Sequence, residues 1–255
     1  MSGHSKWSTI HRQKEIKDAK KGQVFTKIGN AITIAVRSSG GMTDPEKNFK
    51  LRLAIEAARA ANMPKENVAR AIARGSGGAE GLELAEVTYE GYGPGGIAVV
   101  VEAVTDNKNR TIAEIKNIFE REGGSLAGPG AVMFQFKKAS LITIKKGPRP
   151  EEQVLSVMDL GGAEDVEEVS DAIEIYTRPD EVTLVKDRLE KAGFEVLSIE
   201  QIYKPNTPIS IADKSTAEKV IRFMENLENQ DDVQRVCANF DIDGEILERI
   251  KKTPN

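Results

Sequence analysis

The chain has 255 residues, of which 39% are hydrophobic and 30% are charged, and its net charge at pH 7 is −4. This composition is typical of a globular protein, and the length suits two or three compact domains. The sequence has no long apolar run and only one cysteine, Cys237. We therefore expect no membrane span, no internal disulfide and a cytoplasmic location, with Cys237 buried as a small hydrophobe.

The charge is distributed unevenly along the chain. Residues 1–77 carry 15 Lys+Arg and 6 Asp+Glu, whereas residues 78–255 carry 21 and 34. A basic module attached to an acidic body is typical of proteins with phosphate-rich partners. The alternative is that the two parts of the chain attract each other.

The first 77 residues are predicted to form a basic helical domain with an N-terminal arm. Residues 1–23 are polar and rich in lysine, and a helical period begins at Val24. A second helix is predicted over 45–61, with Pro45 in its first turn, and Pro64 starts a third. Gly75 is the expected residue after the third helix, and 75–81 is the expected linker.

The apolar period changes from 3.6 to 2 after this linker. "EVTYEGYGPGGIAVVVEAVT" predicts a β-hairpin, and Thr111 with Glu114 predicts a capped helix start. A glycine-rich loop then leads to an expected strand, "AVMFQF", over 131–136.

Residues 138–204 follow the order β-α-β-β-α-β, which is a complete ferredoxin-like unit. The second helix of this unit is expected to start at Pro179. The flanking pieces, 82–137 and 205–243, are each too small to be stable alone, so we expect them to form one split α/β domain. The predicted fold class is α+β, with a three-helix bundle followed by two α/β ferredoxin-like domains, one inserted in the other.

The sequence offers no convincing catalytic, cofactor or metal site, and we expect a protein that is not an enzyme. "GYGPGG" satisfies G-x-G-x-x-G, but a strand-like run follows it instead of the helix that dinucleotide binding needs. One cysteine and two histidines are too few for a zinc site. The acidic run at 164–168 is most simply a solvated strand edge.

The basic residues are more informative. Lys14, Lys17 and Lys21 share one helical face, as do Arg52 with Arg59 and Arg70 with Arg74. Such side chains neutralise phosphates, and Trp7 has the ring to stack on an unpaired base. The alternative is that the lysines solvate a helix and Trp7 packs on the bundle. The predicted nucleic-acid-binding residues are His4, Lys6, Trp7, His11, Arg12, Lys14, Lys17, Lys20, Lys21, Lys27, Arg52, Arg59, Arg70 and Arg74.

A second polar patch surrounds "TDNKNR" at 105–110. The simpler interpretation is a loop whose side chains satisfy backbone N–H groups at a helix start. The functional alternative is a partner or RNA contact beside the "GYGPGG" turn, made by Tyr89, Tyr92, Asn107 and Arg110.

Five motifs in this order resemble the YebC/PmpR family: "GHSKW", "KGQVFTKI", "ANMPKENVARAIARG", "YEGYGPGG" and "TDNKNRT". The resemblance implies an N-terminal helical domain and two α/β domains, one inserted in the other. It also implies a probable transcriptional regulator that binds DNA, although a related branch activates translation in organelles and bacterial members are linked to relieving ribosome stalling. It implies no catalytic roles.

The leading hypothesis is a regulatory protein without enzymatic activity that binds nucleic acid through the basic first domain. In one version it binds promoter DNA as a transcriptional regulator. In the other it binds ribosomal or transfer RNA, with the ribosome as a partner, and assists translation. An enzyme that uses the "GYGPGG" and "TDNKNR" region is the disfavoured third hypothesis. We expect a monomer or weak oligomer with no membrane partner and no cofactor.

Overall fold

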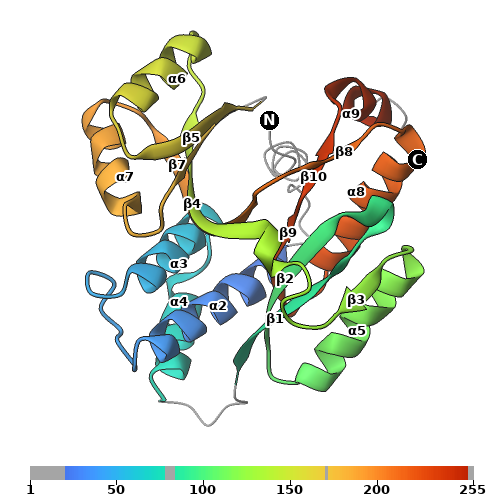
Figure 1. The fold of residues 1–255 in the computed structure, drawn as a ribbon. Helices are drawn as coiled ribbons and strands as arrows, with labels where there is room; N and C mark the ends of the chain where they lie inside the picture. Colours follow the sequence, from blue (N-terminus) through green and yellow to red (C-terminus); the bar gives the residue numbers. More distant parts are fainter. Residues whose placement is uncertain (1–20, 78–83, 170–171, 252–255) are drawn as a thin grey trace.

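The computed structural model describes residues 21–77, 84–169 and 172–251. Within these residues, three helices are followed by two α/β units, and the chain of the second unit is inserted within the first (Figure 1). The predicted fold class is therefore confirmed.

The N-terminal bundle consists of α2 (Lys21–Ser38), α3 (Phe49–Ala60) and α4 (Lys65–Gly75). One apolar face of α2 meets both other helices, because Ile32 and Val36 pack against Leu51, Ala58 and Ala71. These side chains recur at helical spacing, so the sequence alone determines which faces are buried.

Two details of this bundle differ from the prediction. The second helix begins at Phe49, because Asn48 caps it: the Asn48 side chain accepts a hydrogen bond from Leu51 N–H and donates to the Ala35 carbonyl, 2.9 Å away. Gly75 lies within α4 and does not follow it. A Cβ at Gly75 would lie 2.6 Å from the Thr33 carbonyl oxygen, so glycine allows α4 to approach α2 closely.

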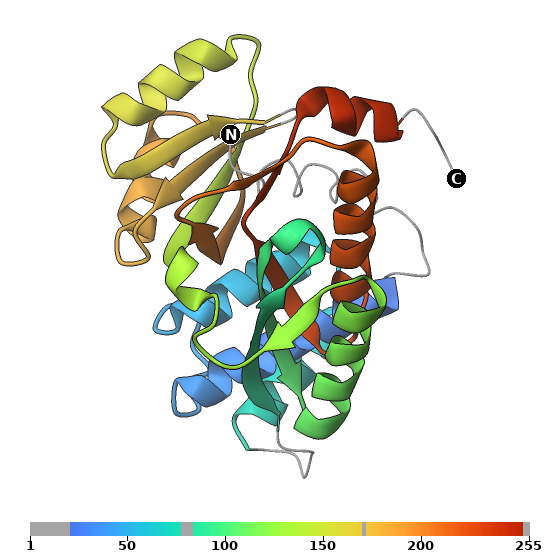
Figure 2. The same ribbon diagram turned by 45° about the vertical axis from the view of Figure 1, so that its right-hand side comes forward.

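The split α/β unit contains a four-stranded antiparallel sheet in the order β3-β1-β2-β9. Its strands are β1 (Ala85–Tyr92), β2 (Ala98–Thr105), β3 (Ser125–Ala127) and β9 (Val233–Ala238). A short parallel pair, β8 (Ile209–Ile211) with β10 (Phe240–Ile242), adjoins it. Figure 2 shows α5 (Lys108–Arg121) and α8 (Lys214–Glu228) on the same face of the sheet.

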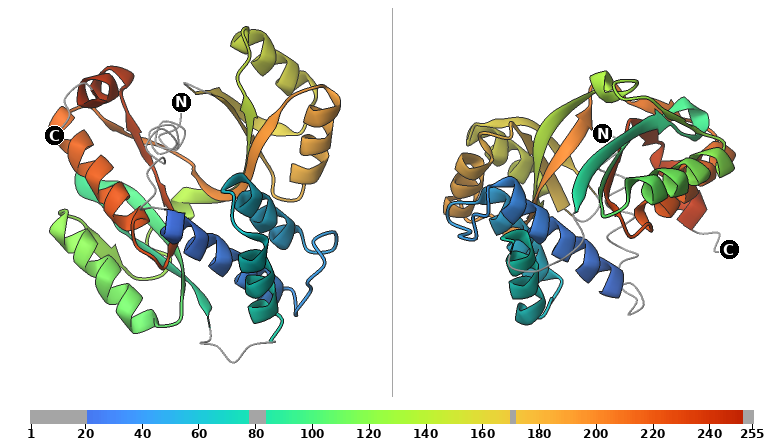
Figure 3. Two further views of the ribbon diagram at one scale, coloured as in Figure 1. Left: turned by 180° about the vertical axis from the view of Figure 1, so that it is seen from behind. Right: turned by 90° about the horizontal axis from the view of Figure 1, so that it is seen from below.

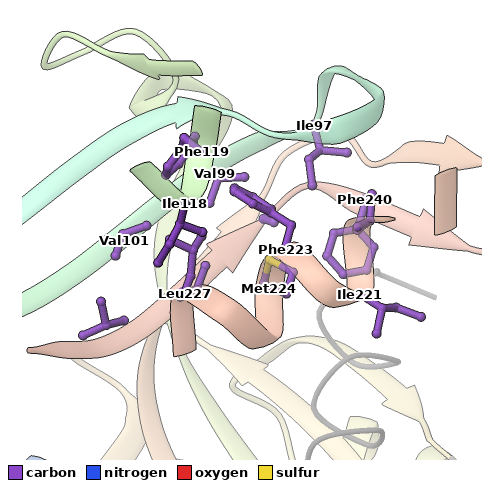
Figure 4. Close-up of a cluster of buried hydrophobic side chains, with 14 of the residues drawn as sticks. Ile97, Val99, Val101, Ile118, Phe119, Ile221, Phe223, Met224, Leu227 and Phe240 are labelled. Carbon is purple, nitrogen blue, oxygen red and sulfur yellow. The ribbon is translucent and has the colours of Figure 1, made fainter. Parts of the chain in front are cut away.

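The core of the split unit lies between that sheet and the two helices (Figure 4). Val99 and Val101 lie two positions apart on β2 and both face the helices, because every second side chain of a strand points to the same side of the sheet. The rings of Phe119 on α5 and Phe223 on α8 meet edge to face, with centroids 4.9 Å apart. The predicted burial of Cys237 is confirmed, since it is 0% exposed on the opposite face of β9.

The inserted unit has the strand order β5-β6-β4-β7, which is that of a ferredoxin-like sheet. Its elements are β4 (Phe136–Lys145), α6 (Pro150–Asp159), β5 (Ala163–Glu168), β6 (Ala172–Thr177), α7 (Val182–Lys191) and β7 (Val196–Pro205). Both helices cover the same face, where Ile142, Ile144, Ile173 and Ile175 are buried.

Several predicted element boundaries in the two α/β units are wrong. The expected strand over 131–136 is instead a 3-10 turn, η3 (Met133–Gln135), and β4 begins only at Phe136. The second helix of the inserted unit, α7, starts at Val182 rather than Pro179. A terminal helix, α9 (Gly244–Lys251), lies beyond the last predicted element.

The strand β4 pairs with β7 from Phe136↔Pro205 onward, so one ladder runs across the expected boundary near residue 138. The domain boundaries 1–77, 82–137 plus 205–243, and 138–204 stay predictions.

The bundle contacts both α/β units (Figure 3). Lys27 of α2 donates to the Glu228 carbonyl at the end of α8, and Gln23 donates to the Asn229 carbonyl and to Asp231. On its other side, α3 packs near α7, where Glu56 lies 3.9 Å from Lys186.

Within the part of the chain that the structure describes, no helix combines the length and the apolar character needed to cross a membrane.

Candidate nucleic-acid interface

The predicted binding residues divide into those outside the described residues and those placed on the bundle. His4, Lys6, Trp7, His11, Arg12, Lys14, Lys17 and Lys20 lie outside the described residues. Lys21, Lys27, Arg52, Arg59, Arg70 and Arg74 lie on the three helices.

Arg74 makes its contacts inside the bundle. Its guanidinium donates to the Thr33 hydroxyl at 2.9 Å and to the Asn30 side-chain oxygen at 3.1 Å. Burial lowers the pKa of Arg74 from its ordinary value. Thr33 also donates to the Ala71 carbonyl, so this small network joins α4 to α2.

Arg52 and Lys27 also face other parts of the protein. The Arg52 guanidinium stacks over the Phe49 ring, 5.3 Å from its centroid, and lines a small pocket where α3 meets α7 and β7. Lys27 donates to the Glu228 carbonyl.

Arg59 and Arg70 project into solvent from α3 and α4, and Lys21 is exposed at the start of α2. Lys50 and Lys65 are also exposed on the bundle, and sequence reasoning did not single them out. A helical-face count of the kind used for Arg70 and Arg74 would have found them. The bundle therefore presents exposed cations on α3 and α4, whereas three of the predicted cations have internal contacts.

The second predicted patch centres on a carboxylate that sequence reasoning missed, Asp232. It accepts hydrogen bonds from the hydroxyls of Thr105 at 3.0 Å and Thr111 at 2.6 Å, and it pairs with Arg110 at 3.0 Å. Burial alone would raise the pKa of Asp232, but these donors outweigh it and lower the pKa below its ordinary value. Arg110 also pairs with Asp106, 2.9 Å away.

The simpler interpretation of "TDNKNR" is confirmed at the helix start. Asn107, not Thr111, caps α5, and its side-chain oxygen accepts from Arg110 N–H at 3.1 Å. The capping box predicted at Thr111 is wrong because the helix already begins at Lys108. The Tyr89 hydroxyl donates to the Lys108 carbonyl at 3.5 Å. A partner contact through this patch stays a prediction.

The "GYGPGG" segment forms the turn of the β1–β2 hairpin, in which Gly93 N–H donates to the Ile97 carbonyl at 2.8 Å. A Cβ at Gly91 would lie 2.5 Å from the Phe119 ring, and one at Gly93 would lie 2.7 Å from the Phe223 ring. These glycines therefore let the hairpin rest directly on α5 and α8. The Tyr92 hydroxyl donates to the Ala131 carbonyl, 3.1 Å away.

Glu90 in the same strand is a second residue that sequence reasoning missed. Its carboxylate is buried and accepts from the backbone N–H groups of Gly130, Val132 and Met133 at 2.6–2.8 Å. Burial would raise the pKa of Glu90, and the three donors outweigh it, so the pKa is lowered. Glu90 thus fixes the loop that joins the split unit to β4.

The acidic run of β5 does form the edge of its sheet, as predicted, but it is not simply solvated. Glu164 pairs with Lys137 at 3.0 Å and Glu168 pairs with Lys146 at 2.6 Å. Asp165 and Glu167 both pair with Lys204 of β7.

Across residues 21–77, 84–169 and 172–251, no group of three or more His, Cys, Asp or Glu side chains could hold a metal ion.

Comparison with known proteins agrees with the fold. Residues 5–78 match the TACO1/YebC protein N-terminal domain, and residues 84–240 match the TACO1/YebC second and third domain. A protein of Sulfurihydrogenibium sp. named probable transcriptional regulatory protein is 48% identical over 98% of this chain and 100% of its own length. One of the same name from Dictyoglomus turgidum is 47% identical over 98% of this chain and 100% of its own length.

A solved structure shares the architecture. The crystal structure of a conserved hypothetical protein from Aquifex aeolicus is 44% identical, with a TM-score of 0.83 over 90% of this chain and 94% of that one. The chain therefore belongs to the TACO1/YebC family.

Proposed function

We propose that this protein is a cytoplasmic regulator without enzymatic activity, which binds nucleic acid through its basic N-terminal domain. The observation that carries the proposal is the charge division, with 15 Lys+Arg against 6 Asp+Glu in residues 1–77. Cations at this density raise the local concentration of phosphates and bind them with a salt-dependent affinity.

The described residues support an assignment of roles within this domain. Arg59 and Arg70 are exposed and available to phosphate oxygens, whereas Arg74 joins two helices. The residues before Lys21 supply further cations and the only tryptophan of the chain, Trp7. The names of the relatives, probable transcriptional regulatory protein, make promoter DNA the first candidate target.

One observation favours RNA as the second candidate. The helices α3 and α4 are joined by the short turn at 61–64. The most exposed side chains of α4 are charged residues and alanines: Lys65, Glu66, Ala69, Arg70 and Ala73. A recognition helix normally presents amide and hydroxyl side chains to base edges as well. The acidic body also disfavours an arrangement in which the whole protein lies along a duplex.

Crosslinking of the protein in cells, with the recovered nucleic acid sorted into DNA and RNA, tests the two targets. Recovery of promoter DNA without ribosomal RNA would exclude the translation version, and the reverse recovery would exclude the transcription version. Recovery of neither nucleic acid above the level of an uncrosslinked control would contradict the proposal itself.

The substitution Lys14→Glu with Lys17→Glu is expected to weaken binding and to flatten its dependence on salt. Fluorescence anisotropy of a labelled oligonucleotide over a range of salt concentrations measures both quantities. An unchanged slope of log K against log salt would show that these two lysines do not contact the phosphates.

A further inference from the structure

The loop between β3 and β4, residues 128–135, is held by hydrogen bonds from three other segments of the chain (Figure 1). We call this loop the connector. Glu90 of β1 accepts from three of its backbone N–H groups at 2.6–2.8 Å. The Asn206 N–H donates to the Gln135 carbonyl at 2.8 Å, and the Asn239 side chain donates to the Gln135 side-chain oxygen at 3.1 Å. The backbone of the connector is therefore fixed, although its longest regular element is a single 3-10 turn.

Phe134 projects from this fixed backbone into solvent. It is 73% exposed, the largest exposed fraction among the large hydrophobic residues that the structure describes. The Asn206 side chain donates to the Phe134 carbonyl at 3.2 Å, so the backbone beneath the ring is held as well. A phenylalanine this exposed gives little of the hydrophobic stabilisation that a buried one contributes. A rigid backbone that holds an aromatic ring outward is the arrangement of a preformed binding contact.

A second exposed aromatic side chain lies against the connector. Tyr92 at the end of β1 is exposed, and its hydroxyl donates to the Ala131 carbonyl at 3.1 Å. Across the described parts of the chain, Tyr92 and Phe134 are the two exposed aromatic side chains. The described helices of the bundle therefore present cations to solvent, whereas the exposed rings lie at the connector.

The segments around the connector carry lysines and no carboxylates. Residues 91–101, 123–139 and 201–212 contain three lysines and no Asp or Glu, although the chain beyond residue 77 carries 34 Asp+Glu against 21 Lys+Arg. The pairing of β1 with β3 and of β4 with β7 brings these segments together. One of the three lysines, Lys204, is buried and pairs with Asp165.

The other two lysines, Lys137 and Lys138, are exposed at the start of β4. Lys137 pairs with Glu164 at 3.0 Å, and the Lys138 ammonium lies 5.8 Å from the centroid of the Tyr203 ring. An exposed ion pair contributes little to stability, so the Lys137 ammonium can exchange this partner for another anion. The end of the connector is therefore suited to a partner that carries negative charge.

We propose that Phe134 and Tyr92 stack on unpaired bases of a single-stranded nucleic acid whose phosphates pair with Lys137 and Lys138. Nucleic acid as the class of partner rests on the proposed function, and the connector adds a second contact to the one on the bundle. Aromatic rings combined with cations hold single strands in many proteins, because every base has a flat face that can stack.

The surroundings of Phe134 favour a base over an apolar pocket of a partner protein. The centre of a protein interface is normally built from several large apolar side chains. The other exposed large hydrophobic side chains of the described residues are aliphatic and belong to other elements: Met42, Ile112, Leu155, Met158, Leu184 and Leu197. The connector itself has exposed glycines at Gly128 and Gly130, which leave space beside the ring for a flat base.

The substitution Phe134→Ala in the full-length protein tests the stacking contact. Anisotropy titrations use a labelled short single strand, prepared as RNA and as DNA, and the corresponding DNA duplex. We expect single-strand affinity to fall about 5- to 150-fold, the range for the loss of one base stack, and duplex affinity to stay unchanged. A loss confined to RNA or to DNA would identify which single strand is the target.

The matched control is Leu155→Ala, which removes another exposed large hydrophobic side chain, from α6, and should leave every affinity unchanged. Equal single-strand affinity of the wild type and Phe134→Ala would overturn the proposal and leave a protein partner as the reason for the exposed ring. An equal loss of affinity for the duplex would overturn it too, because paired bases offer no free face to the ring.

The variants Phe134→Trp and Phe134→Leu separate stacking from the loss of apolar bulk. Tryptophan keeps an aromatic face and should retain the single-strand affinity, whereas leucine keeps an apolar side chain without a ring and should lose it as alanine does. A strand that contains 2-aminopurine gives a direct signal, because the emission of this base analogue falls when it stacks. Wild-type affinity and quenching in Phe134→Leu would overturn the stacking.

The phosphate contacts have their own test. Lys137→Gln with Lys138→Gln should reduce the slope of log K against log salt for a single strand by about 1.4, because each phosphate contact contributes about 0.7. The control is Lys116→Gln with Lys145→Gln, which removes the same charge from exposed positions of α5 and of the far end of β4. The same reduction in both variants would overturn these contacts.

These measurements separate this inference from the proposed function. Unchanged single-strand affinity in Phe134→Ala, together with a reduced salt slope in Arg59→Gln with Arg70→Gln, would refute the stacking and retain binding through the bundle. The reverse pattern would retain the stacking and refute the role of the bundle. Failure of the wild-type protein to bind any of the oligonucleotides would overturn both.

Discussion

At the scale of single residues, the structure depends on small or buried groups rather than on the exposed charged side chains. Gly75 allows two helices to touch, and Glu90 gathers three backbone N–H groups of one loop. Each of these residues makes a contact that no larger or uncharged side chain can reproduce, so each substitution has a definite expected cost.

Gly75→Ala is expected to lower the free energy of unfolding by about 1–3 kcal/mol. The added Cβ would lie 2.6 Å from the Thr33 carbonyl oxygen and 2.7 Å from Val36 Cβ, so α4 must move away from α2. The control is Gly22→Ala in α2, where no atom of the described residues lies within 4 Å of the added carbon and a small stabilisation is expected. Chemical denaturation measures both, and equal effects would refute the close-packing argument.

Glu90→Gln is expected to cost about 2–3 kcal/mol of folding stability. The buried amide would direct its own N–H groups at the donors of the 130–133 loop, leaving donors unpaired. Glu86→Gln, on an exposed position of the same strand, is the matched control and should change stability by less than about 0.5 kcal/mol. Thermal unfolding of both variants measures the two losses of folding stability.

At the scale of elements, one carboxylate joins three of them. Asp232 precedes β9 and binds Thr105 at the end of β2 together with Arg110 and Thr111 of α5. Val104 N–H of β2 also donates to the Asp232 carbonyl at 2.8 Å. The motif "TDNKNRT" is thus explained largely by the contacts that connect the β1–β2 hairpin, α5 and β9.

Asp232→Asn is expected to destabilise the protein by about 2 kcal/mol at neutral pH, since it removes charge-assisted hydrogen bonds. Asp231→Asn is the control because that exposed neighbour accepts from the Gln23 side chain and has no part in the contacts of Asp232. Denaturation of the two variants under the same conditions should show the cost at position 232 alone. A loss of equal size at position 231 would contradict the assignment.

The lowered pKa of Asp232 also makes a prediction about pH. A carboxylate whose folded-state pKa lies below its unfolded value of about 3.9 contributes stability above that value, and this stability is lost as the pH falls through the folded-state pKa. The difference in stability between the wild type and Asp232→Asn should therefore be constant near neutral pH and shrink below about pH 4. A difference that grows on acidification would show that the pKa is raised instead.

At the scale of the whole molecule, a basic bundle is attached to acidic α/β units through few polar contacts. Gln23 and Lys27 bind the end of α8, and Lys186 approaches Glu56. The exposed cations of α3 and α4 remain on the outside of this arrangement. We therefore expect the binding surface of the proposed function to lie on the bundle rather than on the sheets.

Arg59→Gln with Arg70→Gln is expected to reduce the slope of log K against log salt by about 2 for duplex DNA, because each lost phosphate contact removes about 0.9. The control is Arg121→Gln with Arg149→Gln, which removes the same charge from exposed positions outside the bundle. Anisotropy titrations at several salt concentrations measure the slope. The same reduction in both variants would show a general charge effect rather than a contact.

The regular elements were largely predictable, because a helix or strand that is buried on one side has apolar residues spaced at its own structural period. The hairpin predicted from "EVTYEGYGPGGIAVVVEAVT" is formed by β1 and β2, and the predicted order β-α-β-β-α-β is that of the elements from β4 to β7. The errors fall where a side chain from elsewhere changes a boundary: Asn48 caps α3 by reaching the Ala35 carbonyl, and Glu90 holds the segment that was expected to be a strand. Neither partner is recognisable from local sequence.

The sequence by itself determined the α+β fold class, the family and the division of charge, because these follow from periodicity, motif order and counts of ionisable groups. Only the tertiary structure decided which cations face solvent and which join helices, since that depends on the packing of α4 against α2 and of α3 against the inserted unit. The same holds for Lys204 of β7. Its pairing with Asp165 and its distance of 3.9 Å to Glu167 arise only because β5 and β7 belong to one sheet.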